Sequence, residues 1–232
     1  YPKNKFEVIV IDNGSIDESY KTIAKLFPQT KLIRNKHNLG YVTAINQGLE
    51  TAKGKYIFLG NDDMIIDKDA IFQLVKYLNE HPEAGIVGGK IYYKSSPDKI
   101  ASCGYMLNRW TGNIYDAQKP DLIKEVDWIQ GCALCIRRKA LTRTGNLDDR
   151  FGLIYFEDTD ICFRVKESGY KVIYLPYVHF WHGVTTTMNK NLPAKYFYWY
   201  KNKIQFILKH LNFPQIICIL SLQIFLVFPI RL

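Results

Sequence analysis

Two short acidic clusters in this 232-residue chain carry side chains suited to metal or proton chemistry. Asp62 and Asp63 follow an apolar run at 56–60 and the intervening Asn61, and Glu157, Asp158 and Asp160 form the second cluster. Carboxylates that follow a buried strand are held rigidly at the edge of a crevice, where a ligand can approach them. A polar loop would account for either cluster alone, but the two together indicate a functional site.

The first cluster predicts a site for a divalent metal ion. Carboxylate oxygens are hard ligands that suit Mg²⁺ or Mn²⁺, and such ions also bind diphosphates and stabilise charge on a departing phosphate. His182 is a candidate to complete the metal shell with a neutral imidazole, and a structural role beside Phe180 and Trp181 is the alternative. A solvated turn is the alternative for Asp62 and Asp63, because Asp67 and Asp69 follow them.

The second cluster offers a general base. A carboxylate beside a reacting hydroxyl takes its proton as the new bond forms, which typically contributes a factor of about 10²–10⁴. Glu157 and Asp158 are the candidates. Asp160 is expected instead to cap a helix that begins at Ile161.

Asp12, Asn38 and Gly40 are candidates to bind a nucleotide. Asp12 ends the first predicted strand, where its carboxylate could accept from a base N–H or a ribose hydroxyl. The alternative is that Asp12 builds an Asx-type turn, with Ser15 or Asp17 capping the next helix. Gly40 would let the backbone approach a ligand, and a helix N-terminus favours phosphate. A glycine-eased contact between helix and sheet is the alternative there.

The elements that position these residues alternate between strand and helix. Strand-like runs are found at 6–11, 31–34, 56–59 and 84–87, and helical patterns at about 15–26, 38–52 and 69–79. This order predicts an α/β fold with a mostly parallel sheet flanked by helices. Beyond residue 90 we expect hairpins at 91–115, strands at 127–136 and 171–175, the second of them broken by Pro176, and a helix at 161–168.

The C-terminal part predicts an aromatic helix at 194–211 and an apolar stretch at 216–228. The stretch falls short of the roughly 20 apolar residues that span a bilayer. Lys201, Lys203 and Lys209 precede it, and basic residues beside an apolar segment suit a cytoplasmic membrane face. We therefore expect membrane association, through a truncated transmembrane helix, an in-plane helix or a helix docked on the domain.

Composition narrows the class of partner. Lys and Arg number 31 against 22 Asp and Glu, a net charge of +9 that favours an anionic partner. The basic residues are spread along the chain, which makes nucleic acid a weaker choice than lipid or a phosphorylated small molecule. Cys132 and Cys135 form a C-x-x-C pair within a strand-like run, so core packing is expected rather than a zinc site. An odd cysteine count and no secretory leader favour a cytoplasmic location.

Taken together, the chain resembles the family 2 glycosyltransferases, especially the rhamnosyltransferase-like members. The matching segments run from about residue 6 to 190: VIVIDNGSIDES, NLGYVTAINQGL, GKYIFLGNDDMII, GCALCIRRKAL, LDDRFGLIYFEDTDICFRVKESGYKVIYLP and HFWHG. The resemblance implies a glycosyltransferase A-type fold, with a nucleotide-sugar-binding half at 1–89, an acceptor-binding and catalytic half at 90–193, and a tail at 194–232. It also implies truncation at both ends, with the family's first strand and P-x-Y/F-N loop lying before Tyr1.

The resemblance assigns roles to the donor-side residues. Asp12 looks like a contact to the donor nucleotide. Asn61, Asp62 and Asp63 occupy the position of the family's D-x-D-like motif, with Asp63 the expected metal ligand and His182 completing the site. The first position of the motif is Asn rather than Asp, so a direct metal bond is not expected from Asn61.

On the acceptor side, Glu157 and Asp158 match the family's E-D pair, with Asp158 resembling the base, and Trp128 falls where an acceptor-stacking aromatic is often found. The resemblance implies inverting transfer of a sugar from a nucleotide diphosphate to a hydroxyl of a glycan or lipid-linked acceptor. Two other classes stay open from the residues: a nucleotidyltransferase of similar fold, and an inactive membrane-associated scaffold.

Overall fold

The computed structural model describes residues 5–183 and 191–222. At its centre is a seven-stranded mixed sheet, and the order of its main strands is β3 (Tyr56–Gly60), β10 (Ala133–Arg137), β5 (Ala84–Tyr93), β11 (Lys171–His182) and β4 (Met64–Ile66). β6 (Ser96–Ser102) pairs with β5, and β9 (Lys124–Glu125) pairs with β11. β7 (Tyr105–Leu107) and β8 (Ile114–Asp116) form a separate hairpin. The expected α/β class is confirmed.

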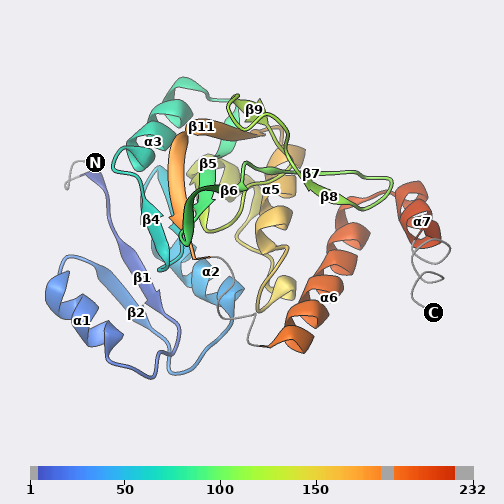
Figure 1. Cartoon of the computed structure of the whole chain (residues 1–232). Coiled ribbons are helices and arrows are strands. Elements are labelled where there is room, and N and C mark those ends of the chain that lie inside the picture. Colours follow the sequence, from blue (N-terminus) through green and yellow to red (C-terminus); the bar gives the residue numbers. More distant parts are fainter. Residues whose placement is uncertain (1–4, 184–190, 223–232) are drawn as a thin grey trace.

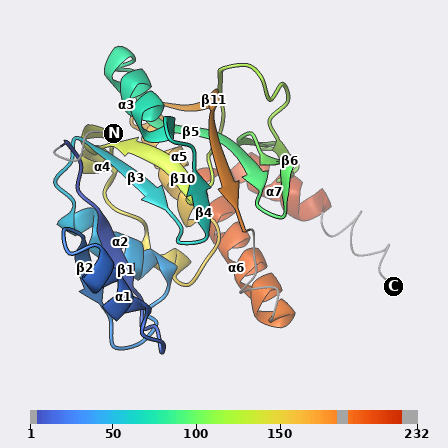
Figure 2. The same ribbon diagram turned by 60° about the vertical axis from the view of Figure 1, so that its left-hand side comes forward.

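Strand direction is parallel between β5 and β11, and β10 runs antiparallel to both of its neighbours, β3 and β5. β1 (Ile9–Asp12) and β2 (Lys31–Arg34) form a separate parallel pair. This pair and α1 (Ser19–Leu26) lie on one side of the molecule, and the C-terminal helices lie on the other (Figures 1 and 2).

Helices cover both faces of the central sheet because successive strand residues point to opposite sides. On β5, Ile86 belongs to a core cluster shared with α2 (Tyr41–Thr51), α4 (Arg138–Thr144), α5 (Glu157–Glu167) and α6 (Leu192–His210). The next residue, Val87, faces the opposite cluster, which includes Leu74 and Leu78 of α3 (Ala70–Glu80). Both residues are fully buried, as expected of a strand covered on both faces.

Three local predictions about the second half are wrong. The strand expected at 127–136 is confined to β10, and β11 continues through Pro176 to His182. Its pairing with β5 shifts register between Leu175 and His179, and such an irregularity accommodates a proline that has no N–H to donate. The third correction concerns α5, which begins at Glu157 rather than at Ile161.

Asp160 therefore lies in the first turn of α5 and is not its cap. Its N–H donates to the carbonyl of Phe156 at 2.8 Å, as in a regular helix. Three acidic residues occupy this first turn, and Arg164 and Lys166 lie in the last. This arrangement complements the helix dipole, which explains why the helix starts within the acidic cluster.

The predicted aromatic helix is confirmed as α6. Asn191 caps it by accepting from the N–H of Ala194 at 3.2 Å, and a proline occupies its first turn. α7 (Phe213–Leu222) covers the beginning of the predicted apolar stretch, and residues 223–228 of that stretch lie outside the described residues. Within the described ranges, no helix has both the length and the apolar character needed to cross a bilayer.

Candidate functional site

The register between β4 and β11 brings Asp63 beside His182. Asp63 directly precedes β4, and Met64 pairs with His182 across the two strands. As a result, the Nε2 atom of His182 lies 3.1 Å from Oδ1 of Asp63. The amide nitrogen of Asn61 lies 3.4 Å from the same Nε2 atom. Two residues of the D-x-D-like motif, Asn61 and Asp63, thus meet the distant histidine at one point.

The surroundings of Asp63 fit a hard cation. Its Oδ1 atom is buried and, apart from the Nε2 atom of His182 at 3.1 Å, has no polar partner within the described part of the chain. Its Oδ2 atom occupies space that a side chain at residue 183 would fill, because a Cβ on Gly183 would lie 2.8 Å away. No group of three or more His, Cys, Asp or Glu side chains in residues 5–183 and 191–222 gathers around a possible metal. Two protein ligands suit Mg²⁺ or Mn²⁺, which commonly take further oxygens from substrate phosphates and water.

The register of β10 brings the second acidic cluster to the same place. Gly60 at the end of β3 pairs with Ala133 at the start of β10, so Gly131 and Cys132 lie next to the motif that follows β3. The N–H of Gly131 donates to Oδ2 of Asp158 at 2.9 Å. The sulfur of Cys132 lies 3.9 Å from Nδ1 of His182. One short segment therefore contacts both Asp158 and His182.

Tyr41 lies between the two clusters. Its hydroxyl donates to Oδ1 of Asn61 at 3.4 Å. The same hydroxyl would lie 3.6 Å from a Cβ on Gly131, and that Cβ would be 3.2 Å from Cβ of Asp158. Burial raises the pKa of Tyr41 well above its usual value, so its hydroxyl keeps its proton. A side chain at residue 131 would therefore press against Asp158.

The two neighbouring carboxyl groups differ in their environment. Oδ1 of Asp158 accepts from the N–H of Thr159 at 2.6 Å, in addition to the Gly131 contact of Oδ2. Burial raises the pKa of Asp158, and these hydrogen bonds oppose the increase. Glu157 has a buried Oε2 atom without a hydrogen-bond partner in the described ranges. Burial, followed by the charge of Asp158, raises the pKa of Glu157 to about 8. At neutral pH, Glu157 is therefore the protonated member of the pair, and the two N–H groups that donate to Asp158 favour placing the negative charge there.

A Glu157→Gln variant is expected to change how stability depends on pH. The folded protein holds a proton on Glu157 up to about pH 8, whereas the ordinary value is 4.5. Between these values the folded state binds more protons than the unfolded state, so this group lowers stability as pH rises through the window. Glutamine cannot ionise. Relative to the wild type, the variant should gain of order 5 °C in Tm at pH 8 and little at pH 4.5. Thermal melts across this range would contradict the assignment if the difference were constant.

The nucleotide-binding candidates form a separate polar network near the start of α2. Asp12 is 5% exposed and accepts from the N–H of Ser15 at 2.9 Å, as in an Asx-type turn, and from Arg34 at 3.1 Å. Hydrogen bonding from Ser15 lowers the pKa of Asp12. Asn38 accepts from Asn13 at 2.9 Å and from the N–H of Gly40 at 2.8 Å. The contact of Asp12 with a nucleotide stays a prediction.

Gly40 adopts a φ of 90°, and its backbone approaches the 152–153 segment. The N–H groups of Tyr41 and Val42 donate to the carbonyls of Leu153 and Gly152 at 3.1 and 3.2 Å. These amides at the start of α2 are therefore already used within the protein. The close backbone approach expected at Gly40 exists, but its partner is this loop.

Asp62 and Trp128 make none of the contacts described above for Asp63 and Asp158. Asp62 is exposed, in contrast to its neighbour Asp63. Trp128 is only 6% exposed, and its ring stacks on Tyr105 with centroids 5.2 Å apart. Its stacking on an acceptor stays a prediction, and one ring face is already covered.

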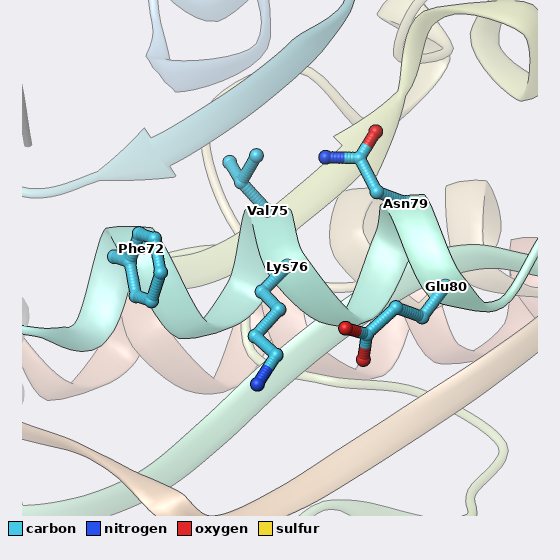
Figure 3. Close-up of a pocket in the computed structure, with 5 residues that line it drawn as sticks. All are labelled: Phe72, Val75, Lys76, Asn79 and Glu80. Carbon is cyan, nitrogen blue, oxygen red and sulfur yellow. The ribbon is translucent and has the colours of Figure 1, made fainter.

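Tyr41 and Gly131 are the site residues that sequence reasoning did not single out. Both lie in segments that matched the family, NLGYVTA and GCALC, so a signal was available. Cys132 and Cys135 are buried free thiols in the core, as expected. A shallow hollow over α3, lined by Phe72, Val75, Lys76, Asn79 and Glu80, contains none of the predicted site residues (Figure 3).

Comparison with solved structures shows a shared fold. GalNAc-T7, solved with UDP, GalNAc and Mn²⁺, matches with a TM-score of 0.65 and 15% identity over 78% of this chain and 38% of its own. The mannosyltransferase PcManGT of Pyrobaculum calidifontis, solved with GDP-Man and Mn²⁺, matches with a TM-score of 0.57 and 20% identity over 81% of this chain and 50% of its own. The expected glycosyltransferase A-type fold is confirmed.

Sequence relatives point to the same family. The N-acetylglucosaminyl-diphospho-decaprenol L-rhamnosyltransferase of Mycobacterium tuberculosis is 25% identical over 73% of this chain and 64% of its own length. The poly-β-1,6-N-acetyl-D-glucosamine synthase of Staphylococcus aureus is 28% identical over 79% of this chain and 44% of its own length. The chain thus spans less than two thirds of either relative. Because the model of glycosyl transferase family 2 matches residues 1–144, more than half of the 232, the chain belongs to that family.

Proposed function

We propose that this chain carries out inverting transfer of a sugar from a nucleotide diphosphate to a hydroxyl of a glycan or lipid-linked acceptor. The observation that supports it best is the meeting of two chemically different groups at one site. Asp63 and His182 lie 3.1 Å apart on one side, and Asp158 is anchored to Gly131 on the other. A donor diphosphate and an acceptor hydroxyl require these two functions.

In the proposed reaction, Asp158 takes the proton of the acceptor hydroxyl. The acceptor oxygen forms a bond to the anomeric carbon while the bond from that carbon to the diphosphate oxygen breaks. Attack and departure on opposite faces invert the configuration. The ionised Asp158 keeps free lone pairs beside its two N–H contacts, and a base with a raised pKa accepts a proton more readily at neutral pH.

Asp63 and His182 would hold a divalent ion, Mg²⁺ or Mn²⁺, which supplies positive charge to the departing diphosphate. Asn61 would orient His182 through its side-chain amide, 3.4 Å away, rather than bind the ion. Protonated Glu157, buried beside Asp158, adds no second negative charge near the reacting hydroxyl. Two relatives of similar fold were solved with Mn²⁺ and a nucleotide or nucleotide-sugar, which supports this choice of cofactor.

A donor screen on the full-length protein tests the proposal. UDP-GlcNAc, GDP-mannose and a nucleotide-activated rhamnose would be supplied with Mn²⁺ or with a chelator, and the released nucleotide identified. Release of a nucleoside diphosphate that stops with chelator is the expected result. Release of pyrophosphate would indicate a nucleotidyltransferase, and no turnover with any donor would favour an inactive scaffold.

We also propose that α6 and α7 contact the surface of an anionic membrane. Tyr196, Tyr200, Ile204 and Leu208 are spaced four residues apart on α6, and each is at least half exposed. On α7, Phe213, Ile217 and Leu220 are also exposed. These residues, defined here as the apolar stripe, would enter the interface of a bilayer, and exposed Lys201 would favour anionic headgroups.

Replacing Ile204 and Leu208 by Ser should weaken vesicle binding about tenfold or more, because each substitution removes apolar area from the lipid interface. Co-sedimentation with phosphatidylcholine vesicles, with and without 30% phosphatidylglycerol, would measure it at roughly physiological salt. Phe72→Ser on α3 is the matched control, because Phe72 is 49% exposed on a helix over the other face of the sheet. Equal losses in both variants, or no binding by the wild type, would contradict the proposal.

A further inference from the structure

The loop that precedes α5, the helix that carries Glu157 and Asp158, is held in place through its backbone carbonyl groups. Residues 151–155 directly precede Phe156 and Glu157. The backbone carbonyl of each of these five residues accepts a hydrogen bond from another element. The carbonyls of 152 and 153 accept from the first N–H groups of α2. The carbonyls of 151, 154 and 155 accept from a single side chain, Asn202 of α6. The loop is therefore clamped between two helices that are distant in sequence.

Asn202 is fully buried, and its Nδ2 atom lies 2.8 Å from the carbonyls of Phe151 and Ile154 and 2.9 Å from that of Tyr155. An amide nitrogen carries two hydrogens, so the three acceptors share them. Removing the side chain would leave three carbonyls without this donor at a buried position.

The clamped loop has a conformation that needs support. Tyr155 and Phe156 adopt φ values of 74° and 70°, in the left-handed region that residues other than glycine rarely occupy. Such residues persist where surrounding contacts over-determine the backbone. Because Phe156 immediately precedes α5, any relaxation of these two residues moves the helix that carries Glu157 and Asp158.

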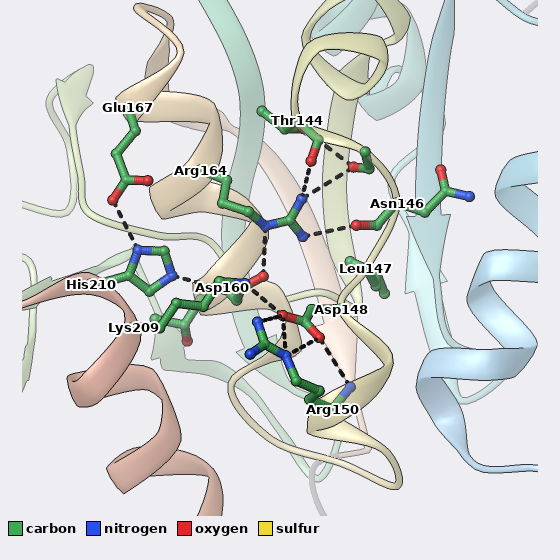
Figure 4. Close-up of polar contacts among 12 residues, drawn as sticks. Thr144, Asn146, Leu147, Asp148, Arg150, Asp160, Arg164, Glu167, Lys209 and His210 are labelled. Carbon is green, nitrogen blue, oxygen red and sulfur yellow. Dashed lines mark hydrogen bonds and ion pairs between the residues drawn. The ribbon is translucent and has the colours of Figure 1, made fainter.

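A second contact between α5 and α6 lies about two turns beyond Asn202 on α6, and within the first turn of α5. Asp160 of α5 is fully buried, forms an ion pair with Lys209 of α6 at 2.6 Å, and lies 2.8 Å from Nε2 of His210 through its Oδ1 atom. Arg164 completes the cluster at 2.7 Å, and His210 also reaches Glu167 at 2.9 Å (Figure 4). This cluster holds α6 against α5, and it thereby helps to keep Asn202 within hydrogen-bond distance of the loop.

We propose that Asn202 is a positioning residue for sugar transfer, which sets the position of Asp158 by clamping residues 151–155 from α6. The inference rests on the proposed function, because it assigns Asn202 an effect on the base of that reaction. Asn202 touches neither Asp158 nor the Asp63–His182 pair. It acts on the chemical step and leaves the donor's metal side unchanged.

The test compares Asn202→Ala with Gln205→Ala in the full chain. Gln205 is the matched control because it lies on the same helix, and its buried amide nitrogen makes no hydrogen bond within the described part of the chain. In Asn202→Ala, kcat should fall about 10- to 100-fold, because small displacements of a reacting group have effects of this size. The KM for the best donor should stay within about threefold. Gln205→Ala should keep kcat within about threefold.

Hydrogen exchange provides a readout that does not depend on turnover. Amides of residues 153–160 should exchange at least about tenfold faster in Asn202→Ala than in the wild type, with little change in Gln205→Ala. Asn202→Ser, which keeps one hydrogen-bond donor, should give intermediate values of kcat and of the exchange rates. It replaces the alanine variant in the test if that variant does not fold.

A folded Asn202 variant with wild-type kcat or unchanged exchange at 153–160 overturns the inference. Equal falls in kcat for the Asn202 and Gln205 variants also overturn it, since they would indicate a general loss of packing. If the wild-type protein transfers no sugar from any donor, the proposed function fails and the inference fails with it. Wild-type turnover with unaffected Asn202 variants refutes the inference alone.

Discussion

Replacing Asp158 by Asn is expected to lower kcat by about 10³-fold, within the usual range for loss of a general base. Asparagine has nearly the same shape and can still accept from the N–H of Gly131, but it cannot take up a proton. The donor side of the site should be unaffected, because Asp63 and His182 are held by separate strands. Single-turnover rates and calorimetric titration with the nucleotide diphosphate and Mn²⁺ measure the two effects independently.

The same carboxyl-to-amide change at Glu157 gives the comparison that identifies the base. Glu157 is protonated at neutral pH, so glutamine resembles its working form. The factor by which kcat falls in Glu157→Gln should be at least about ten times smaller than the factor in Asp158→Asn. A larger loss at Glu157, or turnover retained in Asp158→Asn, would show that Asp158 is not the base.

Asp63→Asn should weaken metal-dependent binding of the donor by roughly 10- to 100-fold. The change removes the charge of the candidate ligand while keeping its size, and His182 is the one polar partner of the buried Oδ1 atom in the described ranges. Binding of Mn²⁺, followed by electron paramagnetic resonance with and without UDP or GDP, measures the loss without relying on turnover.

Asp62→Asn is the matched control for this prediction. It makes the identical change one residue away, at an exposed side chain. We expect it to keep Mn²⁺ affinity within about threefold, since exposed charges interact weakly. If Asp62→Asn abolishes Mn²⁺ binding while Asp63→Asn retains it, the ligand is Asp62.

Much of the fold followed from local patterns. The alternation of strand and helix up to the start of β5 and the aromatic helix α6 were predictable because periodic segments encode their own type, although the short strand β4 was not expected. The direction of β10 was not predictable, since a short buried strand carries the same residues whichever way it runs. The passage of β11 through Pro176 depends on its irregular pairing with β5, which is a long-range property.

The start of α5 could have been predicted from the sequence, but the prediction placed it four residues too late. Acidic residues at 157, 158 and 160 and basic residues at 164 and 166 are typical of the first and last turns of one helix. Treating Asp160 as a cap moved the start to Ile161. The consequence is functional, because the true start makes Asp160 the centre of the cluster between α5 and α6.

The sequence by itself determined the kinds of groups at the site: carboxylates after a strand, a second acidic pair, and a histidine near the end of the matched region. Tertiary structure decided which of them meet, because strand register places His182 opposite Met64 and Ala133 opposite Gly60. It also decided that Glu157 holds its proton and that Asn202 clamps the loop before Asp158. Burial sets the pKa of Glu157, and contacts between elements distant in the chain set the position of the loop before Asp158. Neither property can be predicted from the residues next to them in the sequence.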